Sequence, residues 1–322
     1  MLKIGVLGVG YLGRIHLKCI QALKNYEITG FYDISEERAS KAESDFNIKR
    51  YYNYLELIED SDVVSIITPT ASHYEYARAA ITRSRHVFIE KPLVNNTKEA
   101  EELIKLSEEA EVKVQVGHVE RFNPGFLSVR KQIDNPMFIE AHRLSDFNSR
   151  GIDIPVVYDL MIHDIDIILS VVNSPIKRIS ASGVPIISKT PDIANARIEF
   201  DNGAVANLTA SRISMKKMRK VRFFQRKTYI TVDFLNKKSE LIKLKTDDQE
   251  NHQNIFQTIS FPGMENKKIN IYQPEIIESN AIQAELKYLY DSIINDTDPV
   301  VTINDGYNAL FVAQTIMDKI KF

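Results

Sequence analysis

The feature that most constrains the fold is the spacing of Gly8, Gly10 and Gly13 between two segments near the start of the chain. Leu2 to Leu7 reads as a buried strand, and Tyr11 to Leu23 carries apolar residues at helical spacing. Gly8 permits the tight turn, Gly10 lets a pyrophosphate approach the helix amides, and Gly13 allows close packing of helix and strand. The spacing therefore predicts a strand, a glycine turn and a helix that bind a dinucleotide.

An acidic residue follows at the distance that such a site requires. Asp33 ends the apolar segment Glu27 to Asp33, twenty positions after Gly13. A carboxylate there accepts hydrogen bonds from the adenosine ribose diol and repels a 2′-phosphate. Because Ile34 follows, with no Arg or Ser beside the carboxylate, the sequence favours NAD over NADP.

Composition and charge exclude several classes of protein. The 322 residues are 44% hydrophobic and 26% charged, with a net charge of −2, so no global field favours nucleic acid. No apolar run reaches transmembrane length and no secretory leader is evident, so we expect a cytoplasmic protein without a membrane partner. The single cysteine, Cys19, excludes an intrachain disulfide and a cysteine zinc cluster.

Strand and helix patterns alternate through about the first 120 residues, which predicts a doubly wound parallel sheet. Further buried strands are expected at Val63 to Thr68, His86 to Ile89 and Val112 to Val116. Crossover helices are expected at Ser35 to Phe46, His73 to Thr82 and Thr97 to Ala110. We place this Rossmann domain at residues 1–122.

After Asn123 the pattern changes, which predicts an α+β second domain, residues 123–322, built on a mostly antiparallel sheet with helices on one face. Its last helix can pack back on the first domain. Residues 196–200 and 204–210 predict a hairpin around Asp201, Asn202 and Gly203. Further strands are expected at residues 228–234 and 240–244, and helices at 156–172, 280–294 and 307–320.

Two polar clusters stand out against this framework. Glu90, Lys91 and Pro92 follow a buried strand at the edge where an open parallel sheet presents residues to its ligand. Proline restricts the backbone of Lys91 to extended geometry, so the direction of the Lys91 side chain is restricted as well. A solvated Glu–Lys pair beside a loop proline is the alternative.

The second cluster lies within an apolar helical segment. Asp159 and His163 are four residues apart and share a helix face, as do His163 and Asp166. A carboxylate could fix the imidazole tautomer for acid and base chemistry, or the histidine could be a satisfied structural residue. A second histidine or a close third ligand is absent, so we expect no metal.

One segment concentrates basic residues. It runs from Arg212 to Lys227 and holds Lys216, Lys217, Arg219, Lys220, Arg222 and Arg226 without an acidic residue. Such an excess suits a diphosphate, although a solvated strand face explains it equally well.

The chain resembles the glucose-fructose oxidoreductase, inositol dehydrogenase and MocA (Gfo/Idh/MocA) family. The likeness is carried, in order, by Gly8 to Gly13, Thr68-Pro69-Thr70 with His73, Glu90-Lys91-Pro92, and Asp159 with His163. It implies a Rossmann domain, a C-terminal sheet domain that mediates oligomers, a nicotinamide site, and a lysine-proline bond that is often cis. One departure is Met161, because many members have glycine two residues before the histidine.

The resemblance also implies roles for residues. Lys91 and His163 flank the reacting carbinol, and Asp159 orients the histidine, so these three are the candidate catalytic residues. His163 is the first choice for the general base, and Lys91 is the alternative acceptor of the hydroxyl proton. The candidate cofactor-binding residues are Gly8, Val9, Gly10, Tyr11, Leu12, Asp33, Thr68, Pro69, His73, Glu90 and Lys91. Candidate substrate-binding residues are Lys91, Asp159, His163, Arg121 and Asn123, although Arg121 could equally form a structural ion pair.

A finer likeness is to sugar-nucleotide dehydrogenases of the UDP-N-acetylglucosamine 3-dehydrogenase type. It is carried by residues 116–124 and 158–166. We therefore expect an enzyme that moves a hydride between NAD and a sugar secondary alcohol, C3 of a UDP-N-acetylhexosamine, as a homodimer or homotetramer. The alternatives are a dehydrogenase of a free polyol, inositol or aldose, and a non-catalytic NAD-binding regulator. Lys91 and His163 argue against the regulator.

Overall fold

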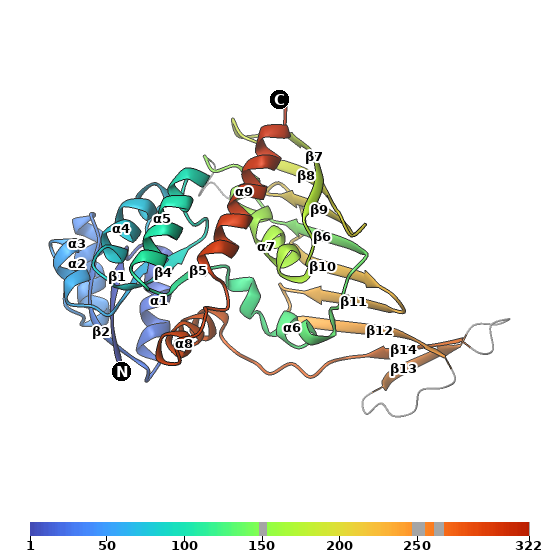
Figure 1. Cartoon of the computed structure of the whole chain (residues 1–322), viewed down its shortest axis with the longest axis horizontal. Helices are drawn as coiled ribbons and strands as arrows, with labels where there is room; N and C mark the ends of the chain where they lie inside the picture. The colour runs from blue at the N-terminus through green and yellow to red at the C-terminus, as the bar shows by residue number, and fades with distance from the viewer. Residues whose placement is uncertain (148–152, 247–254, 261–266, 322) are drawn as a thin grey trace. The chain divides into compact units, whose positions relative to one another are not determined.

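The computed structural model describes residues 1–147, 153–246, 255–260 and 267–321. The chain divides into two compact units, residues 1–119 with 280–311, and residues 120–279 with 312–322. Segment 280–311 thus belongs to the first unit, whereas the sequence places it in the second domain. Figure 1 gives the element labels used below.

The first unit is built on a parallel five-stranded sheet in the order β2-β1-β3-β4-β5. Its strands are β1 (Leu2–Leu7), β2 (Tyr26–Tyr32), β3 (Val63–Ile66), β4 (His86–Glu90) and β5 (Val114–Gly117). All residues of β3 and β5 are buried, as expected for a sheet covered on both faces. The predicted doubly wound sheet is confirmed.

Four of the helices of this unit begin where a polar side chain caps their first-turn amides. The helices of the unit are α1 (Tyr11–Gln21), α2 (Glu36–Phe46), α3 (Tyr54–Glu59), α4 (His73–Ile81), α5 (Thr97–Glu109) and α8 (Ala281–Ile294). Ser35, Asn53, Asn96 and Asn280 accept hydrogen bonds from the first turns of α2, α3, α5 and α8. Leu286 and Leu289 of α8 join the core that α1 shares with β1 and β2.

In the second unit the described strands form a nine-stranded sheet, β13-β14-β12-β11-β10-β6-β9-β8-β7. They are β6 (Phe138–Leu144), β7 (Ile176–Val184), β8 (Ile193–Phe200), β9 (Val205–Ser211), β10 (Met218–Gln225), β11 (Thr228–Asp233), β12 (Lys238–Thr246), β13 (Ile255–Ser260) and β14 (Lys267–Tyr272). Only the β6–β9 pair among them is parallel. The prediction of a mostly antiparallel sheet is confirmed.

Burial alternates along these strands, which places one face of the sheet in the core. In β6 the side chains of Ile139, Ala141 and Arg143 are buried, and the residues between them are only partly covered. The predicted hairpin is β8 and β9, and Gly203 in its turn has φ +85°.

The second unit also contains helical segments. They are α6 (Pro124–Leu127), a π-helical turn (Val157–Met161), α7 (Ile162–Val171) and the C-terminal part of α9 (Ile303–Lys319). Helix α7 contacts β6 and β9, and α6 contacts β11 and β12. The segment expected as one helix over residues 156–172 therefore begins as a π-helical turn. No helix in the described part of the chain is both long enough and apolar enough to span a bilayer.

Candidate active site

The glycine turn has the geometry that its residues predict. Gly8 has φ +90°, a conformation that favours glycine. A Cβ on Gly13 would lie 2.0 Å from the Gly8 carbonyl oxygen, so only glycine allows α1 to begin this close to β1. A Cβ on Gly10, by contrast, would meet no atom within 4 Å. The space beside Gly10, at the N-terminus of α1, is open to an approaching anion.

Asp33 is held at the end of β2 by hydrogen bonds to both carboxylate oxygens. The Val9 amide donates to Oδ2 at 2.9 Å, and the Ser35 amide donates to Oδ1 at 2.8 Å. Arg38 adds a charged contact from its Nη2 to Oδ1, also at 2.9 Å. Burial of Asp33 opposes ionisation, but the hydrogen bonds from Arg38, Ser35 and Val9 outweigh it, so the pKa of Asp33 is lowered. The carboxylate is ionised at neutral pH.

Arg38 corrects one step of the sequence argument. The inference of NAD preference used the absence of a basic residue next to Asp33, yet Arg38 reaches the carboxylate from the first turn of α2. A residue five positions away comes near because the chain turns at Ser35 into that helix. The side chain of Arg38 remains 53% exposed.

A cavity of about 570 Å³ lies over this part of the first unit. Seven of the predicted cofactor residues line it: Gly8, Gly10, Tyr11, Leu12, Asp33, Thr68 and Pro69. Seven further lining residues were not predicted from the sequence, namely Tyr32, Ile34, Arg38, Ile67, Ala71, Ser72 and Tyr76. The rings of Tyr32 and Tyr76 are 6.5 Å apart in an edge-on arrangement. Apolar walls, an open helix N-terminus and an acidic group therefore share one cavity.

His73 connects two loops of the first unit. Its Nε2 lies 2.8 Å from the Thr68 carbonyl oxygen, and its Nδ1 lies 3.0 Å from that of Pro92. Burial lowers the pKa of His73, so the ring is neutral at pH 7 and donates one of these bonds. His73 thus holds the loop that follows β3 close to the loop that follows β4.

The turn that carries Lys91 is fixed by Glu90. The Lys91 amide donates to Glu90 Oε2 at 3.2 Å, and Glu90 Oε1 lies 3.1 Å from His16 Nε2. The Lys91–Pro92 bond is cis, as the family resemblance implies. Lys91 therefore follows a buried, hydrogen-bonded glutamate at the carboxyl end of β4.

In the second unit, the residues around His163 form two ion-pair networks. Arg143 is fully buried and bonds Asp164 and Glu120, each at 2.8 Å. Arg121 donates to Asp166 from Nε at 2.7 Å and from Nη2 at 2.9 Å. This contact supports the alternative prediction that Arg121 forms a structural ion pair. These networks fix α7, which carries His163, against β6 and the segment at 120–121.

Asp159 and His163 are both partly buried, and they lie on the π-helical turn and on the first turn of α7 respectively. Asn123 is buried and caps α6, because its side-chain oxygen accepts from the Gly125 amide at 3.0 Å. Its amide nitrogen donates to Glu120 and to the Phe234 carbonyl oxygen. The assignment of Arg121 and Asn123 to substrate stays a prediction.

The basic segment at residues 212–227 contains strand β10, and many of its charges have acidic partners. Lys220 pairs with Asp233 at 3.2 Å and Arg222 with Glu140 at 3.6 Å, both on adjacent strands. Further pairs are Arg212 with Asp192, Lys217 with Asp146 and Arg219 with Glu120. The fold thus accounts for much of the local charge without an anionic ligand.

Comparisons with known proteins agree with this architecture. Residues 2–118 match an oxidoreductase family with an NAD-binding Rossmann fold, and residues 128–230 match the GFO/IDH/MocA C-terminal domain. A UDP-N-acetylglucosamine 3-dehydrogenase of Acidithiobacillus ferrooxidans is 36% identical over 236 residues, which cover 73% of this chain and 75% of that protein. A solved structure of that enzyme superposes with a TM-score of 0.88 at 29% identity and covers 99% of this chain and 97% of its own.

More distant relatives act on inositols. A myo-inositol 2-dehydrogenase of Thermotoga maritima is 26% identical over 229 residues, which are 66% of this chain and 69% of that protein. A scyllo-inositol dehydrogenase of Lactobacillus casei, solved with NAD(H) and scyllo-inositol, has a TM-score of 0.77 at 18% identity and covers 99% of this chain and 97% of its own. This second likeness shows the shared fold.

Proposed function

The chain belongs to the Gfo/Idh/MocA oxidoreductase family, and from this premise we propose that it oxidises C3 of a UDP-N-acetylhexosamine with NAD. We infer this substrate from the similarity to UDP-N-acetylglucosamine 3-dehydrogenase, at 36% identity over 73% of the chain. Inositol dehydrogenases are also related, but at lower identity. A dimer or tetramer remains a prediction that follows from the family.

The residues of the first unit fit a nicotinamide dinucleotide. The space beside Gly10 admits a pyrophosphate, and the cavity has apolar walls around Tyr32 and Tyr76. The ionised Asp33 supports NAD, because a 2′-phosphate would add a second negative charge beside it. The exposed Arg38 side chain has to share Asp33 with a ribose or swing away from it. NAD, when bound, supplies the hydride acceptor.

The protein groups then handle the proton and the developing charge. His163 is the proposed general base that takes the hydroxyl proton, and Asp159 orients its ring. Lys91 is proposed to hydrogen-bond the same oxygen and stabilise its alkoxide character as the hydride leaves. The alcohol thereby loses one hydride to NAD and one proton to His163, and it becomes a ketone. The two groups are carried by different units, Lys91 by the first and His163 by the second.

An absorbance screen for NADH formation tests this proposal. The purified protein is incubated with NAD and, separately, UDP-N-acetylglucosamine, UDP-N-acetylgalactosamine, the free N-acetylhexosamines and inositols. We expect turnover with a UDP-sugar and little with the free sugars. Turnover on inositols alone would assign the chain to the polyol branch, and NAD binding without turnover on any compound would favour a regulator.

A further inference from the structure

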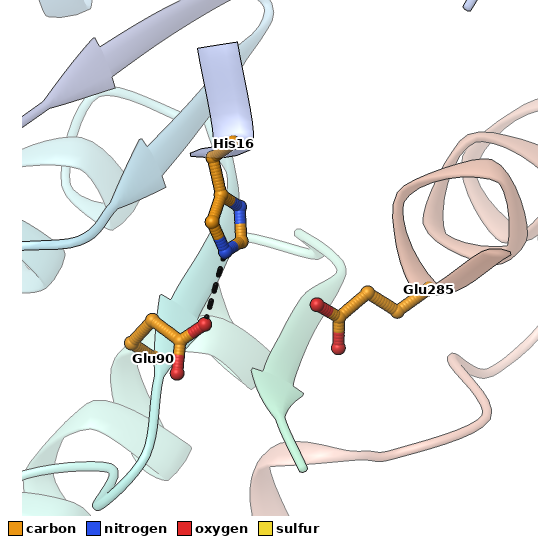
Figure 2. A group of neighbouring side chains, drawn as sticks. All are labelled: His16, Glu90 and Glu285. Atoms are coloured by element: carbon orange, nitrogen blue, oxygen red, sulfur yellow. Dashed lines mark hydrogen bonds and ion pairs between the residues drawn. The ribbon is translucent and has the colours of Figure 1, made fainter. Parts of the chain in front are cut away.

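Three buried ionisable side chains meet behind the Lys91 turn, all within the first unit. They are His16 on α1, Glu90 at the end of β4 and Glu285 on α8, and their exposures are 0%, 8% and 0%. One nitrogen or oxygen atom of each lies within 4.8 Å of the others. Figure 2 shows the carboxyl group of Glu285 turned toward the pair that His16 forms with Glu90.

Glu90 is the member that connects this cluster to Lys91. One oxygen faces His16 Nε2 at 3.1 Å, and the other accepts from the Lys91 amide at 3.2 Å. A Cβ on Gly117 would lie 3.0 Å from the carboxyl carbon of Glu90, so β5 packs directly against this group. The carboxylate is therefore confined between α1, β5 and the turn whose backbone it holds.

Glu285 has no comparable partner in the described part of the chain. Neither of its carboxyl oxygens has a hydrogen bond among the described residues, although the side chain is fully buried. Gln115 of β5 donates to the Glu285 backbone carbonyl instead, at 2.6 Å. A buried carboxylate without a partner costs several kcal/mol, so such a group takes up a proton or a cation.

The groups around Glu285 disfavour ionisation of its carboxyl group. The ionisable groups that face it are His16 and Cys19 from α1 and Glu90 from β4, while Tyr26 of β2 donates to the Leu286 carbonyl oxygen. Burial raises the pKa of Glu285 well above 4.5, and the negative charge of Glu90 raises it further. His16 already interacts with Glu90. The carboxyl group of Glu285 is therefore most simply neutralised by a proton of its own.

We propose that Glu285 is kept as an uncharged acid beside the His16–Glu90 pair, and that these three residues form a proton-holding cluster that positions the Lys91 turn. Loss of the Glu285 proton would set two carboxylates against each other in a buried site. This repulsion would displace the Glu90 carboxylate and so release the Lys91 amide that donates to it. The inference rests on the proposed function only in assigning catalysis to Lys91.

The first test uses stability and needs no substrate. Between pH 4.5 and the folded-state pKa, the unfolded chain releases the Glu285 proton and the folded chain keeps it, so wild-type stability falls as pH rises. Glu285→Gln keeps the shape and cannot ionise. We expect its Tm to exceed that of wild type by about 5 °C at pH 8, with the difference shrinking toward pH 4.5. The control Glu108→Gln, at an exposed position of α5, should show no such trend.

The second test observes the proton directly. The infrared difference between wild type and Glu285→Gln at pH 7 should contain the carbonyl band of a protonated carboxylic acid. A carboxylate band in its place would overturn the proposal. So would one equivalent of divalent metal in the purified protein that is lost in Glu285→Gln together with stability, because the cluster would then be a cation site.

The third test addresses positioning and requires an active substrate. We expect kcat of wild type to decline at alkaline pH and that of Glu285→Gln to decline at a higher pH. Glu90→Leu, which removes the acceptor of the Lys91 amide, should lower kcat at least about tenfold. A shared pH profile for wild type and Glu285→Gln would contradict positioning. If no substrate turns over, the proposed function fails, and the stability and infrared results still decide the cluster.

Discussion

Arg38 donates two hydrogen bonds from Nε and one from Nη2 to the carboxylate of Asp33, the nearest at 2.9 Å. The residue expected to receive the adenosine ribose is thus already bonded to a cation whose side chain is 53% exposed. An arginine at this position can also pair with a 2′-phosphate, so Arg38 and Asp33 act on cofactor choice in opposite directions.

Replacing Arg38 with alanine should sharpen the preference for NAD. The variant keeps the negative charge of Asp33 and loses a cation that contacts it, so NADP is penalised more than NAD. We expect the ratio of kcat/KM for NAD to that for NADP to rise about tenfold, or ~1.4 kcal/mol. Steady-state kinetics with both cofactors measures this. Arg78→Ala, an exposed arginine of α4 paired with Glu102, is the control, and an unchanged ratio in Arg38→Ala would contradict the account.

Removing the Lys91 ammonium should abolish most turnover and leave cofactor binding. Lys91→Met retains the length of the side chain without its charge or proton donors. We expect kcat to fall roughly 10²- to 10⁴-fold, because an alkoxide-stabilising group is lost. The Kd for NAD, measured by calorimetry, should change far less than kcat, because Lys91 is proposed to act on the sugar oxygen; an equal loss of both would assign Lys91 to cofactor binding alone. A variant with wild-type kcat on the correct sugar would remove Lys91 from the mechanism.

Replacing His73 with asparagine should reduce the pH dependence of stability. Its folded-state pKa is lowered below 6.5, so its contribution is fully present above that pH and is lost as the pH falls and the unfolded chain takes up a proton. Urea denaturation at pH 7.5 and pH 5.5 should show a smaller loss for His73→Asn than for wild type. At pH 7.5 the variant should be about 1–3 kcal/mol less stable, since the Thr68 and Pro92 contacts are gone. An equal acid-induced loss in both proteins would refute this role.

The buried Arg143 should dominate the stability of the second unit. Arg143→Met leaves Asp164 and Glu120 buried without their shared cation, which costs about 3–5 kcal/mol. Arg222→Met on the neighbouring strand β10 breaks a 3.6 Å pair whose arginine is 30% exposed, and it should cost below about 1 kcal/mol. Denaturant unfolding compares the two variants. Similar losses would show that burial of the charge network does not set the difference.

The sequence predicted the parts of the fold that follow local rules. The glycine turn, the capped helices α2 and α5 and the hairpin around Gly203 are all determined by residues close together in the chain. The role of the basic residues on strand β10 could not be predicted. They resemble an anion-binding site until their acidic partners on the adjacent strands are known.

Contacts between distant residues could not be read from the sequence. Segment 280–311 returns to the first unit through apolar packing of Leu286 and Leu289 on the α1 core, which periodicity alone does not specify. For the same reason, the cluster of His16, Glu90 and Glu285 was not foreseen: His16 and Glu285 are 269 positions apart. Arg38 reaches Asp33 only because the chain turns into α2 at Ser35, which the immediate neighbours of Asp33 do not indicate.

In the proposed reaction a hydride leaves C3 of a UDP-N-acetylhexosamine for NAD. UDP-N-acetylglucosamine that carries deuterium at C3, with mass analysis of the reduced cofactor, tests this transfer. We expect the cofactor to gain the deuterium and the product to be a 3-keto sugar nucleotide. Reduced cofactor without deuterium, or reduction by free inositol but by neither UDP-N-acetylhexosamine, would contradict the proposed reaction.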